Sequence, residues 1–415
     1  PCPRRRPLIE QQGAADRGIL ICRDRPLNWA HNSKFLAYAG SFIVSKPVAT
    51  QPIRVLLVDD SPIALTILQR LLQATPDIEV VGAVRNGEEA LQAIPLTNPQ
   101  VICTDLHMPK MDGLRLTEEV MARFPRPILV ISASVQEEDS HNVFRLLQAG
   151  AVDVFPKPAA GLPTEYEKAK AALVNRIKVL AGVTVFTRRR SPLTSPASAP
   201  PASSPKPQPV PQSPPTSLAG SQLDMRAPRI LAVGASTGGP QALQTILQPL
   251  PATFPVPVLC VQHISEGFLQ GLVDWLNKEC AIAVTVAQSG TLPQPGTVYF
   301  PPDGRHLELD PQGRLLVSNQ PAVAGYRPSV TLLFQAVAQY YRRAAVGVLL
   351  TGMGRDGADG LQAIAQAGGL TIAQDEATSV VFGMPKAAIA IGAAQNVLPL
   401  DAIAPRLIHL FRAAT

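Results

Sequence analysis

The 415-residue sequence predicts two doubly wound α/β domains with parallel sheets, joined by a proline-rich linker. Three observations support this fold class. Short branched runs alternate with amphipathic stretches over residues 53–180, the alternation resumes after Arg229, and many of the 42 prolines lie between these regions. We therefore divide the chain into a poorly ordered extension over residues 1–50, a first domain over 51–182, a linker over 183–228 and a second domain over 229–415.

The first domain is predicted to contain five strands that alternate with five helices. The expected strands are short and branched, as buried parallel strands are, and run over Ile53–Val58, Ile78–Val84, Val101–Thr104, Pro127–Ile131 and Val152–Phe155. Helix-like segments between them include Ile63–Gln73, Leu114–Arg123 and Glu137–Gln148. Ligands of such a sheet bind at the carboxyl ends of its strands.

The second domain repeats this alternation but has a different middle. Parallel strands are expected at Ile230–Val233, Val256–Val261, Ala345–Leu350 and Leu370–Ala373. Three short runs separated by turn residues predict an antiparallel β-hairpin excursion, and they are Thr297–Phe300, His306–Leu309 and Arg314–Val317.

Composition argues against several functional classes. The net charge of +6 comes partly from arginine runs at 4–6 and 188–190, which we interpret as solvated segments, so we expect no nucleic-acid binding. The five cysteines have no CxxC spacing, the six histidines are scattered, and no apolar run reaches membrane-spanning length. We therefore expect a cytoplasmic protein with no zinc site and no membrane insertion. We also expect a monomer, because neither half shows an obvious assembly surface.

Acidic residues follow two strands of the first domain. Asp59 and Asp60 come directly after the first strand and Asp105 after the third, so their carboxylates should converge and could hold Mg²⁺. Ser132 and Lys157 follow the fourth and fifth strands at the same edge. A carboxylate beside a magnesium ion and a lysine can accept a phosphoryl group. The alternative is that these acids are merely solvated caps.

With the motifs VDDSP, CTDLHMPKMDG, ISAS and AGAVDVFPKP, the first domain resembles a response-regulator receiver domain of flavodoxin-like fold. The resemblance implies that Asp105 is the phosphoacceptor, that it holds Mg²⁺ with Asp59 and Asp60, and that Ser132 and Lys157 contact the phosphate. It also implies a partner histidine kinase that supplies the phosphoryl group.

Two details of this resemblance concern the fifth strand. Many receivers carry an aromatic switch residue three positions before the lysine, where this chain has Val154, with Phe155 next to it. This departure puts the usual switch in question, although not phosphorylation. The resemblance further implies a cis peptide bond between Lys157 and Pro158, which X–Pro statistics alone would not predict.

A small-residue motif opens the second domain. Gly234-x-Ser236-x-Gly238 follows a strand and precedes a helix, which fits a nucleophile elbow with Ser236 exposed at the strand end. A glycine-rich phosphate cradle or a plain tight turn would explain the same pattern. His263 follows the next strand and Asp356 a later one, so a nucleophile, a base and an orienting carboxylate are all available. Alternatively, His263 is a structural hydrogen bonder and Asp356 a helix cap.

A second motif competes for the loop that holds Asp356. The residues from Gly352 to Gly357 read GxGxxG after a strand and before a helix, and Asp375 follows at about the distance seen in dinucleotide-binding domains. This pattern favours a dinucleotide-dependent enzyme. A receiver domain normally controls an effector, however, and a redox output would be unusual.

The motifs GASTGGP, VQHISEGF, PGTVYFPPDGRHL, RPSV, LLTGMGRDGADG and IAQDEATSVVFGMPKAAI extend over nearly all of residues 229–400. With them the chain resembles the family of chemotaxis response-regulator protein-glutamate methylesterases/glutamine deamidases, whose catalytic domain is Rossmann-like. The resemblance implies Ser236 as nucleophile, His263 as base and Asp356 as its orienter. It places Thr237 beside the nucleophile and the Met353 N–H in the oxyanion hole.

The family resemblance also implies an activity and its partners. The expected reactions are phosphorylation-activated hydrolysis of glutamyl methyl esters and deamidation of glutamines on methyl-accepting chemotaxis receptors. The catalytic domain would need no cofactor. A receptor-docking scaffold with an idle esterase remains the alternative from a different functional class.

Overall fold

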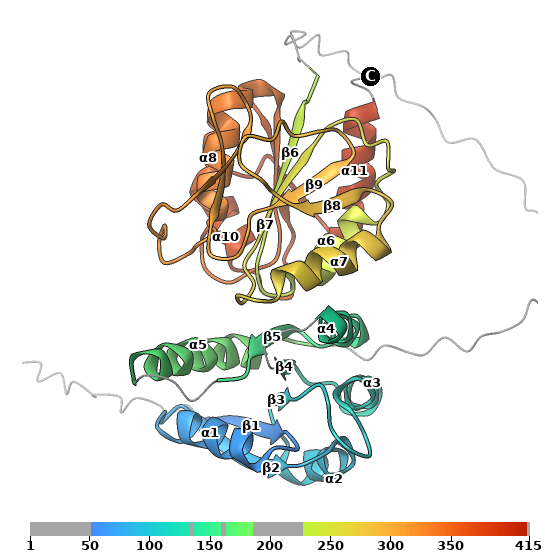
Figure 1. The fold of residues 1–415 in the computed structure, drawn as a ribbon, viewed down its shortest axis with the longest axis vertical. Coiled ribbons are helices and arrows are strands. Elements are labelled where there is room, and N and C mark those ends of the chain that lie inside the picture. Colours follow the sequence, from blue (N-terminus) through green and yellow to red (C-terminus); the bar gives the residue numbers. More distant parts are fainter. Residues whose placement is uncertain (1–50, 133–136, 159–162, 186–226, 413–415) are drawn as a thin grey trace, which may run out of the picture. The chain divides into compact units, whose positions relative to one another are not determined.

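The computed structural model describes residues 51–132, 137–158, 163–185 and 227–412. Within these ranges the chain forms two parallel sheets with helices on both faces, one sheet in each half of the sequence (Figure 1). The extension over residues 1–50 and most of the proposed linker lie outside the described residues. No helix in the described ranges is long and apolar enough to cross a membrane.

The first sheet has five parallel strands in the order β2-β1-β3-β4-β5. They are β1 (Ile53–Val58), β2 (Ile78–Val84), β3 (Val101–Thr104), β4 (Ile128–Ser132) and β5 (Asp153–Pro156). Every residue of β3 and β4 is buried, because these inner strands are covered on both faces. The predicted doubly wound architecture of the first domain is confirmed.

Helices cover both faces of the first sheet. They are α1 (Pro62–Gln73), α2 (Gly87–Thr97), α3 (Gly113–Arg123), α4 (Glu137–Ala149) and α5 (Pro163–Ala181). Successive side chains of a strand point to opposite faces, so Leu57 packs with the residues of α1 and α5, and Val58 with those of α2, α3 and α4. Side chains of Ser61, Asn86 and Asp112 cap the first three helices and fix where each begins.

The second sheet has seven parallel strands in the order β14-β13-β12-β6-β7-β9-β8. They are β6 (Ile230–Ala235), β7 (Val258–Gln262), β8 (Ala283–Val286), β9 (Thr297–Phe300), β12 (Ala345–Leu349), β13 (Leu370–Gln374) and β14 (Asn396–Leu398). The helices are α6 (Gly239–Leu247), α7 (Leu269–Glu279), α8 (Val330–Tyr341), α9 (Ala358–Gln366), α10 (Met384–Ala390) and α11 (Leu400–Arg412). Helices α6, α7 and α11 lie on one face of this sheet, and α8, α9 and α10 on the other (Figure 1).

The excursion in the middle of this domain is smaller than predicted. Strands β10 (His306–Leu309) and β11 (Leu315–Ser318) do form an antiparallel hairpin, as expected. The prediction was wrong for Thr297–Phe300, which is β9 and pairs in parallel with β7 and β8. Strand β8 was missed because it lies at the sheet edge, where two of its four residues are exposed and no continuous apolar run marks it.

One backbone expectation also fails. The peptide bond between Lys157 and Pro158 is trans, and the cis bond among the described residues joins Arg327 to Pro328. The trans form is the ordinary preference of an X–Pro bond, so this site needs no special local geometry.

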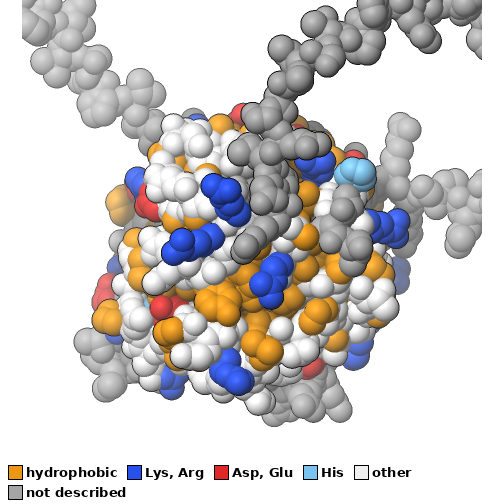
Figure 2. Space-filling view, turned by 90° about the horizontal axis from the view of Figure 1, so that it is seen from above, with side chains coloured by type: hydrophobic (Ala, Val, Ile, Leu, Met, Phe, Trp, Pro, Cys, Tyr) orange, Lys and Arg blue, Asp and Glu red, His pale blue; other side chains and the backbone are white. Residues whose placement is uncertain are grey.

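Proline and aromatic side chains gather where the strands of the second sheet begin. Pro255, Pro257, Tyr340 and Tyr341 line a hollow of about 430 Å³ near the start of β6. Figure 2, which views the molecule from above, shows apolar side chains gathered among lysines and arginines. Ser236 and His263 lie at the other edge, after the carboxyl ends of β6 and β7.

Candidate functional site

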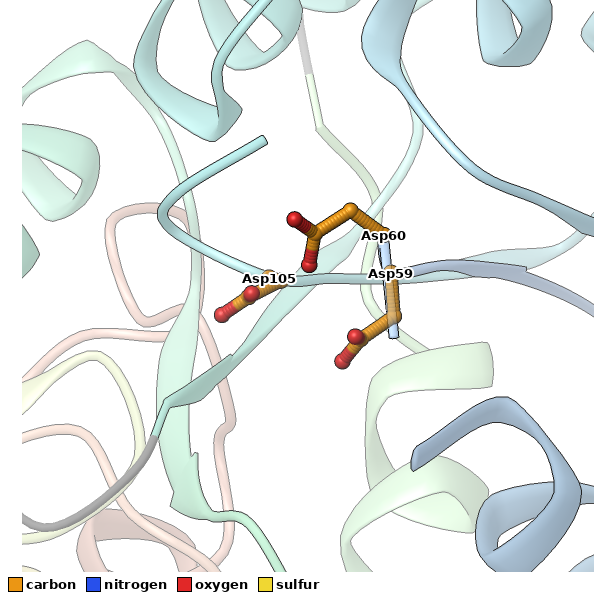
Figure 3. Close-up of side chains that lie close together, drawn as sticks. All are labelled: Asp59, Asp60 and Asp105. Carbon is orange, nitrogen blue, oxygen red and sulfur yellow. The ribbon is translucent and has the colours of Figure 1, made fainter. Parts of the chain in front are cut away.

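The carboxylates predicted to converge in the first domain do so (Figure 3). Asp59 and Asp60 follow β1, Asp105 follows the neighbouring strand β3, and one carboxylate oxygen from each lies within 4.8 Å of the others. Asp59 and Asp105 are buried, whereas Asp60 is exposed. The cluster forms because parallel neighbouring strands end at the same edge of the sheet.

Lys157 links the two buried acids. Its Nζ lies 2.9 Å from Oδ2 of Asp59 and 2.8 Å from Oδ2 of Asp105. Its backbone N–H donates to the carbonyl of Ser132 at 2.7 Å, which brings the ends of β4 and β5 to the same place. Burial raises the pKa of Asp105 and Asp59 raises it further, while Lys157 lowers it. Burial lowers the pKa of Lys157, but the two carboxylates more than offset this and raise it.

The donor set fits a magnesium ion. Carboxylate oxygens are the hard ligands that Mg²⁺ prefers, and this cluster offers three of them. Oδ2 of Asp59 is also buried without a properly oriented hydrogen bond, although Lys157 lies nearby. A buried oxygen in that state is suited to a cation. Asp59, Asp60 and Asp105 are the residues that would hold it.

Ser236 lies in the turn between β6 and α6, at the carboxyl end of the central strand of the second sheet. Gly238 has a φ of 76°, which is the left-handed region. A Cβ on Gly239 would lie 1.9 Å from Oε1 of Gln262. The turn therefore requires small residues around Ser236, which is 6% exposed and lines a cavity of about 380 Å³.

His263 and Asp356 form a hydrogen-bonded pair next to this serine. The strands β12, β6 and β7 are neighbours, and the segments that follow them carry Asp356, Ser236 and His263 respectively. Nε2 of His263 lies 2.9 Å from Oδ2 of Asp356. His263 lines the same cavity as Ser236, so the structure brings all three predicted residues to one place.

The carboxylate of Asp356 is surrounded by donors. Oδ1 accepts from the Ser329 hydroxyl at 2.9 Å and from the N–H groups of Thr331 and Gly357 at 3.0 Å each, and Oδ2 accepts from the Val330 N–H at 2.7 Å. Burial raises the pKa of Asp356, but the interactions with His263 and Thr331 outweigh it and lower the pKa to about 2. Asp356 is therefore a permanently charged partner for His263 at neutral pH.

The other ring nitrogen of His263 is left for chemistry. Nδ1 is buried and has no hydrogen-bond partner within the described ranges, and no hydrogen bond joins it to Ser236 there. With Nε2 engaged by Asp356, Nδ1 is the nitrogen that can take a proton from a nucleophile. Catalytic hydrogen bonds are often long in a ligand-free enzyme and shorten with substrate, so this geometry is compatible with a serine–histidine pair.

Thr237 and Met353 line the same cavity as Ser236. The Ser236 N–H donates to the Thr351 carbonyl at 3.0 Å and is not available to a ligand. The backbone N–H groups of Thr237 and Met353, in contrast, make no hydrogen bond to any part of the chain that the structure describes. Both are therefore available as donors to an oxyanion formed at Ser236.

The GxGxxG loop is not arranged as a dinucleotide cradle. The Gly357 N–H, at the start of α9, is already bound by the Thr331 hydroxyl at 2.7 Å and by Asp356 at 3.0 Å. Asp375 is engaged by the backbone and hydroxyl of Thr378. The donor and the acid that a dinucleotide would need are thus used internally, which argues against that alternative.

Helix α5 of the first domain lines the same cavity. Nη1 of Arg176 forms an ion pair with Asp153 of β5 and donates to Oγ1 of Thr237 at 3.1 Å. Nδ2 of Asn175 lies 3.8 Å from the sulfur of Met353. Sequence reasoning did not identify these contacts, because nothing in the periodicity of either domain predicts which surfaces of the two meet.

The segment before α8 was also missed as a functional element. Its Arg-Pro-Ser-Val sequence contributed only to the family resemblance. Ser329 caps α8, accepting from the Leu332 N–H at 3.3 Å, while its hydroxyl donates to Asp356. A serine ahead of a helical run is a recognisable capping signal, so its place at the helix start could have been predicted. Its contact with Asp356 could not.

Together these features define a response regulator whose output domain is a parallel α/β enzyme. A family model described as CheB methylesterase matches residues 231–407, and one described as response regulator receiver domain matches residues 55–162. A protein-glutamate methylesterase/protein-glutamine glutaminase of Nitrosospira multiformis is 40% identical over 359 residues, which are 86% of this chain and 97% of the relative. A relative of the same description from Geobacter metallireducens is 40% identical over 362 residues, covering 86% of this chain and 99% of the relative.

Among solved structures, the CheB methylesterase catalytic domain of Thermotoga maritima is 38% identical, with a TM-score of 0.43, and covers 44% of this chain and 99% of that domain. The family of this chain is established by the two relatives that match it over nearly their full length. The chain belongs to the family of protein-glutamate methylesterases/protein-glutamine glutaminases that carry a receiver domain. It is accordingly an enzyme that hydrolyses carboxylic esters and amides of protein side chains.

Proposed function

We propose that Ser236, His263 and Asp356 are the catalytic triad of a chemoreceptor methylesterase. The observation that carries the proposal is the ionised Asp356 bound to Nε2 of a histidine whose other nitrogen has no described partner, in the cavity that Ser236 lines. This arrangement supplies a nucleophile, a base and a fixed orienting charge.

The reaction follows from these positions. Ser236 Oγ attacks the carbonyl carbon of a glutamyl methyl ester, and its proton passes to Nδ1 of His263 while Asp356 holds the Nε2–H. The N–H groups of Thr237 and Met353 stabilise the oxyanion. His263 returns the proton to the leaving methoxide, methanol departs, and water hydrolyses the glutamyl-serine ester to leave a carboxylate. A glutamine side chain would release ammonia by the same steps.

The substrates we propose are methyl esters and specific glutamines of methyl-accepting chemotaxis receptors, and the proposed compartment is the cytoplasm. The curated relatives are described as acting on protein glutamates and glutamines, which supports this substrate class. Cys103, Cys260 and Cys280 are buried free thiols, which agrees with a reducing compartment.

Asp105 is the proposed phosphoacceptor, with a histidine kinase as the phosphodonor. Mg²⁺ held by Asp59, Asp60 and Asp105 would neutralise charge on the transferred phosphoryl group. Lys157 lies within 2.8 Å of Asp105 and would bind a phosphate oxygen once Asp105 is modified. Ser132, buried at the end of β4, would contact the same group.

The first domain is proposed to inhibit the second until Asp105 is phosphorylated. Arg176 and Asn175 reach the side chains of Thr237 and Met353, two residues of the proposed catalytic cavity. A receptor segment cannot enter while α5 occupies that side. Phosphorylation at the strand ends would bias the receiver towards a conformation in which this contact is lost.

The test is methanol release from methylated chemoreceptor membranes, with and without a small phosphodonor and Mg²⁺. We expect release to rise with the phosphodonor and to fall by several orders of magnitude in Ser236→Ala. The exposed Ser289→Ala variant serves as the matched control and should retain activity. Undiminished release from Ser236→Ala would disprove the triad. Normal receptor signalling by that variant would instead favour the scaffold alternative.

A further inference from the structure

The ring of Tyr326 stacks on the imidazole of His263. The two ring centroids are 4.4 Å apart and the planes differ by 11°. We propose that Tyr326 is a positioning residue for the catalytic reaction: it holds the plane of the His263 ring so that Nδ1 faces Ser236, and its π face stabilises the imidazolium that forms. This inference rests on the proposed function, because it assumes that His263 is the base.

Tyr326 is held in place by a tight turn. Its N–H donates to the Val323 carbonyl at 2.9 Å, and the Val323 N–H donates to the Tyr326 carbonyl at 3.0 Å. The two residues between them, Ala324 and Gly325, have φ values of 49° and 89°, as in a type I′ turn. Such a turn has little conformational freedom, so the tyrosine ring approaches His263 from a fixed backbone.

The same segment also fixes the carboxylate that binds His263. Ser329, Val330 and Thr331 follow Tyr326 within one short stretch, and each donates a hydrogen bond to Asp356. Residues 323–331 thus control His263 in two ways, through the face of its ring and through the acceptor at its Nε2. Because one segment carries both Tyr326 and the donors to Asp356, the stacked ring and the hydrogen bond at Nε2 orient His263 together.

The imidazole needs a second restraint. It has one described side-chain hydrogen bond, from Nε2 to Asp356, and Nδ1 has none in the described ranges. A ring held at one nitrogen can still tilt about that bond. Stacking prevents the tilt, and an aromatic face also attracts the positive charge that appears when Nδ1 takes the serine proton.

Ordinary packing would be the simpler explanation for this aromatic contact. Tyr326 is only partly buried, however, and it lines the proposed catalytic cavity and not the core. Its hydroxyl makes no hydrogen bond in the part of the chain that the structure describes, so the ring itself is the feature in contact with His263. These contacts favour a positioning role for Tyr326 over a role in core packing. The variants to compare are therefore those that keep or remove the aromatic ring.

The experiment uses the full-length chain, activated by a phosphodonor and Mg²⁺, with methanol release as the assay. Tyr326→Leu should lower kcat by about 3- to 30-fold with little change in KM, which corresponds to the usual strength of aromatic and cation–π contacts. Tyr326→Phe keeps the stacked ring and should restore kcat to within about twofold of the parent. The matched control is Tyr340→Leu, a half-exposed tyrosine outside this cavity that packs against Tyr341.

A second readout is the rate at which a fluorophosphonate labels Ser236, which needs the base but no receptor. We expect Tyr326→Leu to slow labelling in parallel with kcat and Tyr326→Phe not to. The proposal would be overturned if Tyr326→Leu were labelled as fast as the parent. It would also be overturned if Tyr326→Phe and Tyr326→Leu lost the same fraction of the labelling rate. If Tyr326→Leu lowers the melting temperature of the chain, Tyr326→Met takes its place and is compared with the parent and with Tyr326→Phe in the same way. Labelling without any methanol release in the parent would count against the proposed substrate and leave the Tyr326 comparison decisive.

Discussion

The receiver domain and the methylesterase domain place an aspartate at the carboxyl end of a similar parallel sheet, but they surround it differently. Asp105 lies beside a second acid and one ammonium group, and burial with the neighbouring Asp59 raises its pKa in spite of Lys157. Asp356 is also buried, yet donors from His263 and Thr331 lower its pKa to about 2. Burial alone therefore does not determine how a carboxylate behaves.

The difference matches the function proposed for each acid. Both oxygens of Asp356 are engaged, Oδ1 by three donors and Oδ2 by Val330 and His263, so it is held as a fixed charge. Asp105 has an ion pair at Oδ2 and the Leu106 N–H at Oδ1, and it lies in a cluster open to a cation through the exposed Asp60. An acid of this kind can react with a phosphoryl group, because its lone pairs are not all in use.

The strongest test of this comparison is Asp356→Asn. Asparagine replaces one carboxylate oxygen with an NH2 group, which cannot accept from the groups that donate to that position, and the neutral amide would not stabilise the protonated histidine. We expect kcat for methanol release from the activated chain to fall by roughly three to four orders of magnitude. Asp359→Asn, three residues further on in an exposed ion pair with Arg355, should have little effect. Comparable activity in the two variants would mean that Asp356 is structural.

The next test concerns the reactive acid. Asp105→Asn should eliminate phosphoryl transfer, because the amide is not a nucleophile, and the ratio of activities with and without phosphodonor should fall to about one. Radiolabel incorporation from a phosphodonor measures the first effect and methanol release the second. Asp77→Asn, an exposed acid paired with Lys178, should keep both. If the Asp105→Asn variant still incorporated label, the phosphoacceptor would have to be a residue other than Asp105.

Much of the fold could be predicted, because buried parallel strands have continuous branched sequences. The expectation failed at β8 and β9, where β8 is a short, half-exposed edge strand. Strand β9 was assigned to the hairpin, although it pairs in parallel with the predicted strand β7 as well as with β8. The positions of Ser236 and His263 at strand ends followed from the same alternation, since side chains that follow neighbouring parallel strands meet at one edge.

The supporting contacts could not be predicted in this way. Those of Tyr326 depend on a turn that brings its ring onto His263, and those of Arg176 on which surfaces of the two domains meet. Arg176 and Thr237 are hydrogen bonded although they lie 61 positions apart in the sequence, so no local periodicity relates them. Such contacts depend on tertiary packing, and a single sequence carries little information on them.

The smallest expected effect on activity comes from a contact between the two domains that involves neither Asp105 nor Asp356. Nε2 of Gln241 on α6 donates to the Ala151 carbonyl of the receiver at 2.7 Å. Gln244 lies one turn further along α6, is similarly buried, and donates instead to Glu279 within its own domain. The two glutamines thus form a matched pair that differs in which domain they bind.

Gln241→Ala should weaken the closed arrangement by about one hydrogen bond, roughly 1 kcal/mol, and raise methanol release without phosphodonor about fivefold. Gln244→Ala should not change that basal rate, and both variants should reach the parent rate once phosphorylated. An equal basal rate in Gln241→Ala and the parent would show that this contact does not hold the domains together. Inhibition would then depend on other contacts between the domains, among them those that α5 makes at the cavity, from Arg176 to Thr237 and from Asn175 to Met353.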